Sequence, residues 1–256
     1  MREYDISNTV AIVTGGSKGI GYAIVKELAD GGADVVVVSR NLNEAEAAAD
    51  EVRRRGRTGL AISADIQKPG DCEMLVQKTV ESFSRLDILI NNAGTNIRKP
   101  LLEYKEADWD AILDTNLKGL FFCSQFAAME MIKQGKGRVV NISSVGAQLA
   151  APYLGPYCAS KGGITQLTRV CALEWAQYGI TVNAIGPYYI KTPLTEEWVS
   201  DPIRHEKILS RTAIKRLGEP EDVSSLLLML VSDASSYITG QTFYIDGGAL
   251  AGWTDL

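Results

Sequence analysis

The sequence has one histidine and few cysteines. His205 has no second histidine with which to hold a metal ion, so we expect neither a metal site nor a Ser-His-Asp hydrolase. The four cysteines lack the CxxC spacing of zinc sites and the regular pattern of a disulfide framework. We therefore expect buried free thiols at Cys72, Cys123, Cys158 and Cys171.

The sequence also lacks a basic excess and a long apolar run. Its 26 Lys and Arg against 31 Asp and Glu give a net charge of -5, which argues against a nucleic-acid partner. The N-terminus, MREYDISNTV, is polar where a signal peptide needs an apolar core, and no run approaches the roughly 18 apolar residues of a membrane span. We expect a cytoplasmic protein without a membrane partner.

Short β-branched runs alternate with longer helical stretches along most of the chain. Continuous apolar strands such as VVVV are typical of a parallel sheet covered on both faces, and the alternation predicts βαβ units. The fold class is therefore a single-domain, doubly wound α/β fold of the Rossmann type, spanning 1–256. About seven parallel strands are expected, at 9–14, 34–39, 59–63, 86–94, 138–143, 180–186 and 242–246.

One stretch breaks this alternation. Residues 187–217, PYYIKTPLTEEWVSDPIRHEKILSRTAIKRL, show no strand pattern. Long insertions in compact domains are often lids or binding loops. We expect this segment to cover a substrate, and a packed surface excursion is the alternative.

The stretch TGGSKGIG follows the first strand and opens the first helix. Glycines let the backbone approach a pyrophosphate closely, and the helix N-terminus offers free N–H groups. The spacing is Gly15-x-x-x-Gly19-x-Gly21 and differs from the commoner GxGxxG fingerprint. The loop predicts a dinucleotide site.

The end of the second strand indicates which dinucleotide is bound. Ser39 stands where an acidic residue would bind a free ribose 2′-hydroxyl, and Arg40 follows it. A guanidinium binds a 2′-phosphate well, and Lys18 can add a second cation. We therefore expect NADP(H) to be preferred over NAD(H), unless Arg40 is only a solvated charge at the strand end.

Four motifs together resemble the short-chain dehydrogenase/reductase family: TGGSKGIG, NNAG at 91–94, NISS ending at Ser144, and YCASK at 157–161. The resemblance implies that Tyr157 is the general acid/base in hydride exchange between a carbonyl and an alcohol. Lys161 lies one helical turn further on, where its charge can lower the pKa of the phenol. Ser144 is implied to bind the substrate oxygen, with Ser143 as its neighbouring alternative, and Asn116 to hold a water that links Lys161 to solvent.

The resemblance also assigns the cofactor contacts and the assembly. Asp65 and Ile66 would meet the adenine, while Asn91 would serve mainly to stabilise the sheet. A homotetramer is implied, with two unusually apolar helices, within 113–134 and 157–177, at its interface. The cofactor-binding residues expected are Gly15, Ser17, Lys18, Gly19, Ile20, Gly21, Ser39, Arg40, Asp65, Ile66, Asn92, Ala93, Gly94, Tyr157, Lys161, Pro187, Ile190 and Thr192.

Other stretches indicate the substrate. Three stretches are most similar to the gluconate 5-dehydrogenase-like branch, which acts on sugar acids: NNAGTNIRKPLLEY, GPYYIKTPLTEEW and DGGALAGW. Arg98, with Lys99 beside it, can receive a carboxylate. Tyr188 replaces the glycine usual in the family, and its ring must either enter the substrate pocket or shift the backbone. The substrate contacts expected are Arg98, Ser144, Gln148 and Tyr188.

We therefore expect an NADP-dependent oxidoreductase that interconverts a secondary alcohol and a ketone in a small molecule, such as gluconate and 5-ketogluconate. A 3-ketoacyl carrier-protein reductase shares every core motif, and a broad carbonyl reductase is a further alternative. A non-catalytic NADP-binding regulator conflicts with the intact set of Asn116, Ser144, Tyr157 and Lys161. The epimerase and dehydratase relatives have a longer C-terminal domain and different glycine spacing.

Overall fold

The structure is a computed structural model that describes residues 4–252, so that Trp253 of the DGGALAGW stretch lies outside the described residues. Its strands form one parallel sheet in the order β3-β2-β1-β4-β5-β6-β7. The predicted doubly wound sheet is thereby confirmed. The strands are β1 (Val10–Thr14), β2 (Asp34–Ser39), β3 (Gly59–Ser63), β4 (Ile88–Asn91), β5 (Gly137–Ile142), β6 (Ile180–Pro187) and β7 (Thr242–Ile245).

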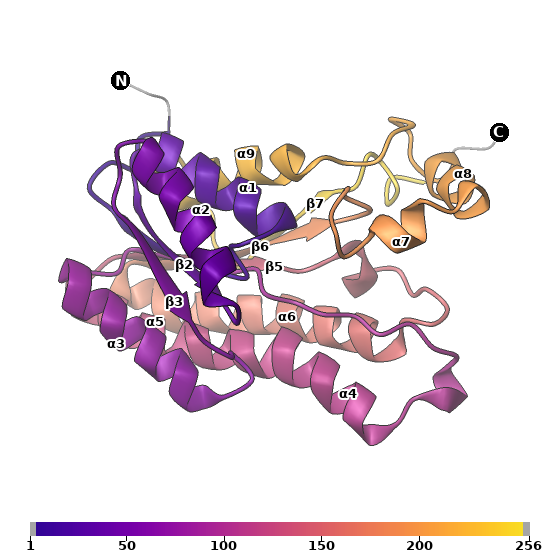
Figure 1. The fold of residues 1–256 in the computed structure, drawn as a ribbon, viewed down its shortest axis with the longest axis horizontal. Helices are drawn as coiled ribbons and strands as arrows, with labels where there is room; N and C mark the ends of the chain where they lie inside the picture. The colour runs from indigo at the N-terminus through magenta and orange to yellow at the C-terminus, as the bar shows by residue number, and fades with distance from the viewer. Residues whose placement is uncertain (1–3, 253–256) are drawn as a thin grey trace.

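Helices cover both faces of this sheet. Figure 1 shows α1, α2 and α9 on one side and α3 to α6 on the other. None of the helices in residues 4–252 has the length and apolarity needed to cross a bilayer. The helices are α1 (Gly19–Asp30), α2 (Leu42–Arg54), α3 (Pro69–Phe83), α4 (Glu106–Leu113), α5 (Gly119–Gln134), α6 (Gly155–Trp175), α7 (Glu196–Val199), α8 (Pro202–Ser210) and α9 (Pro220–Val231).

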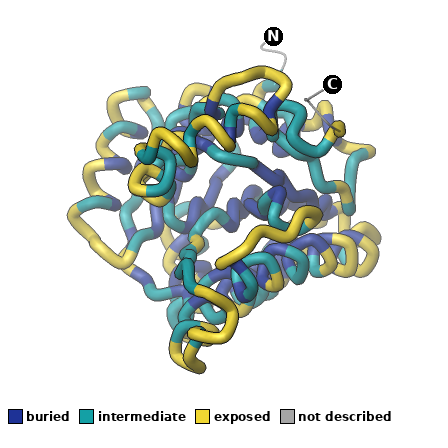
Figure 2. Tube along the Cα trace, turned by 90° about the vertical axis from the view of Figure 1, so that its right-hand side faces the viewer, coloured by how far each residue is buried: buried dark blue, intermediate teal, exposed yellow. Residues whose placement is uncertain are grey.

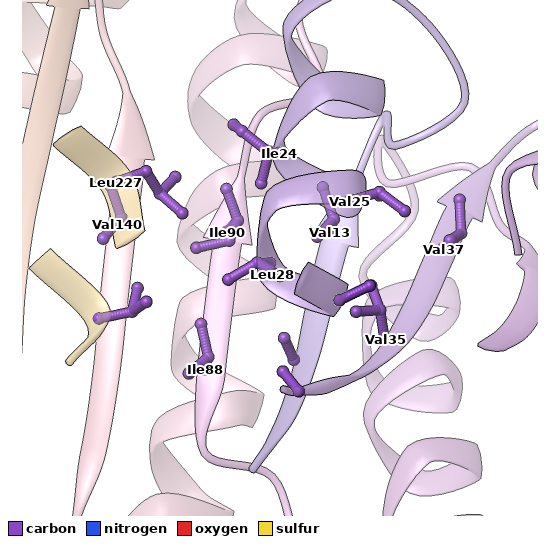
Figure 3. Packing of buried hydrophobic residues seen from close by; sticks show 14 of the residues in the cluster. Val13, Ile24, Val25, Leu28, Val35, Val37, Ile88, Ile90, Val140 and Leu227 are labelled. Carbon is purple, nitrogen blue, oxygen red and sulfur yellow. The ribbon is translucent and has the colours of Figure 1, made fainter. Parts of the chain in front are cut away.

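The valine run of β2 explains why both faces of the sheet are covered. Successive side chains of a strand point to opposite faces. Val35 and Val37 accordingly join the core beneath α1, α2 and α9, and Figure 3 shows them near residues of α1. Val36 and Val38 join the core beneath α3, α5 and α6. In Figure 2 the buried chain lies inside and the exposed chain lies on the outer surfaces. The four cysteines are free thiols, and only Cys158 is less than fully buried.

The strand order places a crevice beside β1. The connections from β1 and from β4 lead to opposite faces of the sheet, and ligands of open α/β sheets bind at such a switch point. Hydrogen bonds join the carboxyl ends of these strands across it: Asn92 Nδ2 donates to the carbonyls of Thr14, at 3.0 Å, and Gly15, at 2.9 Å. The glycine loop is thus fixed to the neighbouring strand.

The predicted lid segment forms helices and no strand. Pro187 belongs to β6, so the excursion begins one residue later than predicted and carries α7 and α8. Within the described chain, its one strand-like contact is a bridge between Ile190 and Gly218. Figure 1 places α7 and α8 beyond the end of β7. That the segment covers a substrate stays a prediction.

The two helices expected at a subunit interface carry apolar residues on the surface of the single chain. Met129 and Ile132 of α5 are exposed, as are Val170 and Leu173 of α6, and Leu173 is 83% exposed. Large apolar side chains left in water favour burial against another surface. The homotetramer stays a prediction.

Candidate active site

The glycine loop joins β1 to α1 in a conformation that depends on glycine. Gly15 and Gly19 adopt left-handed φ angles of 62° and 53°, and a Cβ built on Gly21 would lie 2.2 Å from the Gly15 carbonyl oxygen. No side chain caps the first turn of α1, so its N–H groups stay available to an anion. These features fit the pyrophosphate of a dinucleotide.

A cavity of about 440 Å³ runs from this loop toward Tyr157. Thr192, from the segment after β6, closes it against the loop: a Cβ on Gly19 would lie 3.1 Å from Thr192 Cγ2. Most of the predicted cofactor residues line it. Ser17 and Gly21 do not, and Ser39, Arg40, Asp65 and Ile66 lie beyond it, at or just after the ends of β2 and β3. The predicted residues along the cavity are Gly15, Lys18, Gly19, Ile20, Asn92, Ala93, Gly94, Tyr157, Lys161, Pro187, Ile190 and Thr192.

The region expected to hold the 2′-phosphate contains an acid that the sequence did not reveal. Lys18 Nζ lies 2.8 Å from Glu44 Oε1, in the first turn of α2. Asn41 supports that carboxylate through Nδ2, at 3.2 Å, and caps α2 through its side-chain oxygen. Arg40 is exposed, and Ser17 Oγ donates to Ser39 Oγ at 3.3 Å. The residues fit a phosphate, with Glu44 as a competitor for Lys18.

The predicted catalytic side chains gather at the carboxyl end of β5. A Cβ built on Gly146 would lie 3.4 Å from both Ser144 Oγ and the Tyr157 ring, so the two side chains face the same space. Ser144 lines both cavities, whereas Ser143 lines only the smaller one, is buried, and donates to the Lys161 carbonyl at 3.2 Å. Between the two serines, the geometry favours Ser144 as the residue that meets a ligand.

Lys161 lies beside the ring of Tyr157. Its Nζ is 5.6 Å from the centre of the Tyr157 ring and donates to the Ile142 carbonyl at 2.8 Å. Burial lowers the pKa of Lys161 from 10.5 to about 8. Burial also raises the pKa of Tyr157, and Ser144 and Arg98 offset only part of this effect. Desolvation of the phenolate is thus the dominant effect in the ligand-free chain, and the expectation that Lys161 draws the phenol pKa toward neutrality stays a prediction.

Asn116 lies in a π-helical turn, Asp114–Lys118, between α4 and α5. Such turns are frequent at functional sites. Its Nδ2 donates to the Thr95 carbonyl at 3.0 Å and to Ser160 Oγ at 3.1 Å, and its Oδ1 accepts from Thr95 N at 2.7 Å. These bonds occupy the side chain, so a water held by it, as we predicted, would have to share Oδ1 with Thr95 N.

A larger cavity of about 700 Å³ opens beside Tyr157 and Ser144. Arg98 and Tyr188, both predicted, line it, and Arg98 also lies over the Trp198 ring of α7 at 4.1 Å. Tyr188 takes the first of the two courses predicted for a side chain at this position, because its ring lines the cavity. Gln148 is exposed outside the lining.

Two residues near the cavity differ in role from the sequence interpretation. Lys99 is held by Asp108 at 2.6 Å, which removes it as a free carboxylate receptor. Arg211, at the end of α8, lines the cavity although no motif indicated it. Its only sequence signal was its position inside the predicted lid. Among residues 4–252 no cluster of His, Cys, Asp and Glu could hold a metal.

The chain is similar to known enzymes over nearly its whole length. Residues 15–249 match the family model described as enoyl-(acyl carrier protein) reductase. A tropinone reductase homolog of Arabidopsis thaliana is 42% identical over 248 residues, which cover 96% of this chain and 94% of that protein. A 3-oxoacyl-(acyl-carrier-protein) reductase of Staphylococcus epidermidis is 37% identical over 242 residues, with 94% of this chain and 98% of that protein covered.

Solved structures have the same fold as this chain. The gluconate 5-dehydrogenase of Burkholderia cenocepacia, in complex with NADP and tartrate, superposes with a TM-score of 0.94 at 32% identity, covering 97% of this chain and 98% of that one. The glycine loop, the set of Ser144, Tyr157 and Lys161, and these relatives lead to one assignment. The chain belongs to the short-chain dehydrogenase/reductase family and is an oxidoreductase that acts on alcohol and carbonyl groups.

Proposed function

We propose that the chain is an NADP(H)-dependent enzyme that interconverts a secondary alcohol and a ketone in a sugar acid, such as gluconate and 5-ketogluconate. The observation that carries the proposal is the charge of the larger cavity. Its described lining includes Arg98 and Arg211 and no Asp or Glu, and it meets Ser144 and Tyr157. A guanidinium recognises a carboxylate through two parallel hydrogen bonds.

The site residues take the following roles in ketone reduction. Tyr157 donates its proton to the carbonyl oxygen, and Ser144 donates a hydrogen bond to the same oxygen. The reduced nicotinamide, when bound, supplies the hydride. The raised pKa keeps the Tyr157 phenol protonated at neutral pH, as an acid must be. Lys161, with a pKa of about 8, stays largely protonated and stabilises the phenolate left behind.

The preference for NADP rests on charge. Arg40 and Lys18 are the cations near the end of β2, and the Burkholderia neighbour contains NADP. Glu44 weakens this preference, because it neutralises Lys18 before the cofactor arrives. The segment 188–217 acts as the lid in this proposal, since it brings Tyr188, Leu194 and Arg211 to the larger cavity.

The test compares substrates by following nicotinamide absorbance. NADPH should be oxidised faster than NADH with 5-ketogluconate. Arg98→Met should raise KM for 5-ketogluconate about 10- to 100-fold and that for a neutral ketone less than about threefold, because a lost hydrogen bond to a charge is worth that much. Lys99→Met is the matched control, since Asp108 already holds Lys99. Equal effects of Arg98→Met on both substrates would reject the assignment.

A second candidate is a 3-ketoacyl carrier-protein reductase. The Staphylococcus relative has that activity in its name, and the larger cavity has an apolar part lined by Leu149, Leu154 and Leu250, which suits an acyl chain. A short ketoacyl thioester in the same assay separates the two. Activity with the thioester alone would leave the role of Tyr157 standing and remove the sugar-acid substrate.

A further inference from the structure

Two arginines of the larger cavity, Arg98 and Arg211, form no ion pair within residues 4–252. Lys99 and two cations of the segment 188–217 do form ion pairs. Lys99 is paired with Asp108, Lys191 with Glu219, and Arg216 with Asp222. A guanidinium beside a cavity without acids is neutralised best by an acidic ligand. Two guanidinium groups beside one cavity can bind two acidic groups of one ligand.

Both arginines line the larger cavity together with a tyrosine that each affects. Arg98 shares this lining with Tyr157, and its charge opposes the rise that burial causes in the pKa of Tyr157. Arg211 shares it with Tyr188, and its charge opposes the rise that burial causes in the pKa of Tyr188. Tyr188 lines both cavities, so it lies where the cofactor and substrate spaces meet.

We propose that Arg211 and Tyr188 form a second acid-binding subsite, so that the substrate class is a hydroxy or keto acid with an acidic group at each end. Arg98 binds one carboxylate near Tyr157, and Arg211 binds the other with a further hydrogen bond from the Tyr188 hydroxyl. This inference rests on the sugar-acid function proposed above. It also gives a reason for a tyrosine where the family usually has glycine, because a glycine could not make that bond.

The experiment compares two alcohols with the same carbon skeleton, gluconate with one carboxylate and glucarate with two, oxidised with NADP⁺. The native protein should show the higher kcat/KM with glucarate. Arg211→Met should lower kcat/KM for glucarate about 10- to 100-fold and that for gluconate less than about threefold, because only glucarate offers a second carboxylate. Tyr188→Phe should act in the same direction but less strongly, since it removes only one hydrogen bond.

Arg204→Met is the matched control. Arg204 lies on the same segment, 3.8 Å over the Trp198 ring and outside the cavity lining, so its loss should not change the ratio of the two substrates. The inference fails if the native protein has the higher kcat/KM with gluconate. It also fails if the native protein turns over gluconate but Arg211→Met lowers kcat/KM equally for gluconate and glucarate. Absence of turnover with both acids, beside turnover of a neutral ketone, overturns the proposed function as well. Competitive inhibition by succinate, weakened in Arg211→Met, is a second measurement that needs no turnover.

Discussion

Lys161 should make the protein less stable at neutral pH than a variant without this charge. The side chain is 5% exposed, has no ion pair within the described residues, and bonds only the Ile142 carbonyl. Its pKa falls from 10.5 to about 8, a difference of about 2.5 pH units. At about 1.4 kcal/mol for each pH unit, keeping Lys161 protonated costs the fold about 3 kcal/mol.

The sign of the pH dependence follows from the two states. Below pH 8 both the folded and the unfolded chain carry the proton, so the cost is constant. Between about pH 8 and 10.5 the folded chain releases the proton while the unfolded chain retains it. Because the unfolded state then binds more protons, stability rises with pH by up to about 1.4 kcal/mol per unit. Lys161→Met lacks the group and should lack this rise.

Urea unfolding of both proteins without cofactor, from about pH 7 to about 9.5, measures the effect. At pH 7 the variant should be more stable by up to about 2 kcal/mol. It no longer pays the cost of about 3 kcal/mol for a buried charge, but it leaves the Ile142 carbonyl unbonded, which costs roughly 1–3 kcal/mol. The gap should then change by about 2 kcal/mol in favour of the native protein as the pH rises. Tyr157 stays protonated in both folded proteins over this range, because burial raises its pKa above the usual 10, and groups distant from Lys161 cancel in the difference. A gap that stays constant across this range would refute the burial argument for Lys161.

Two further predictions concern the cofactor and the assembly. Glu44→Gln should lower the Kd for NADPH about two- to fivefold and leave the Kd for NADH unchanged, because Lys18 is then free for the 2′-phosphate. Fluorescence titration measures both constants. An equal change for the two cofactors would show that the 2′-phosphate does not bind at Lys18. Light scattering should show a homotetramer that Leu173→Asp dissociates, since Leu173 is exposed on α6 of the single chain, whereas a native monomer would contradict the predicted interface.

The parts that the sequence predicted are those in which a local pattern has a single physical solution. Val35 to Val38 could be a β-strand only if both of its faces were covered, and they are. The backbone lies too close to Gly21 to admit a Cβ, so the glycine spacing in the sequence was enough to predict the dinucleotide-binding loop. The rise that burial causes in the pKa of Tyr157 could not be predicted, because a helical spacing gives the position of a charge and says nothing about how far burial removes water from the phenol.

The substrate side of the site could not be predicted in the same way, because distant segments build it. The larger cavity takes Arg98 from the loop after β4, Leu149 from the turn after β5, Arg211 from the end of α8, and Leu250 from the C-terminal region. No spacing in the sequence relates these positions, whereas Tyr157 and Lys161 lie one turn apart on α6. The proposed reacting groups therefore lie just after β5 and on the long helix α6, whereas the groups proposed to meet the rest of the substrate lie on loops and on the segment 188–217. If the proposed function holds, substitutions at Arg211 and Tyr188 should change the choice of substrate without displacing Tyr157.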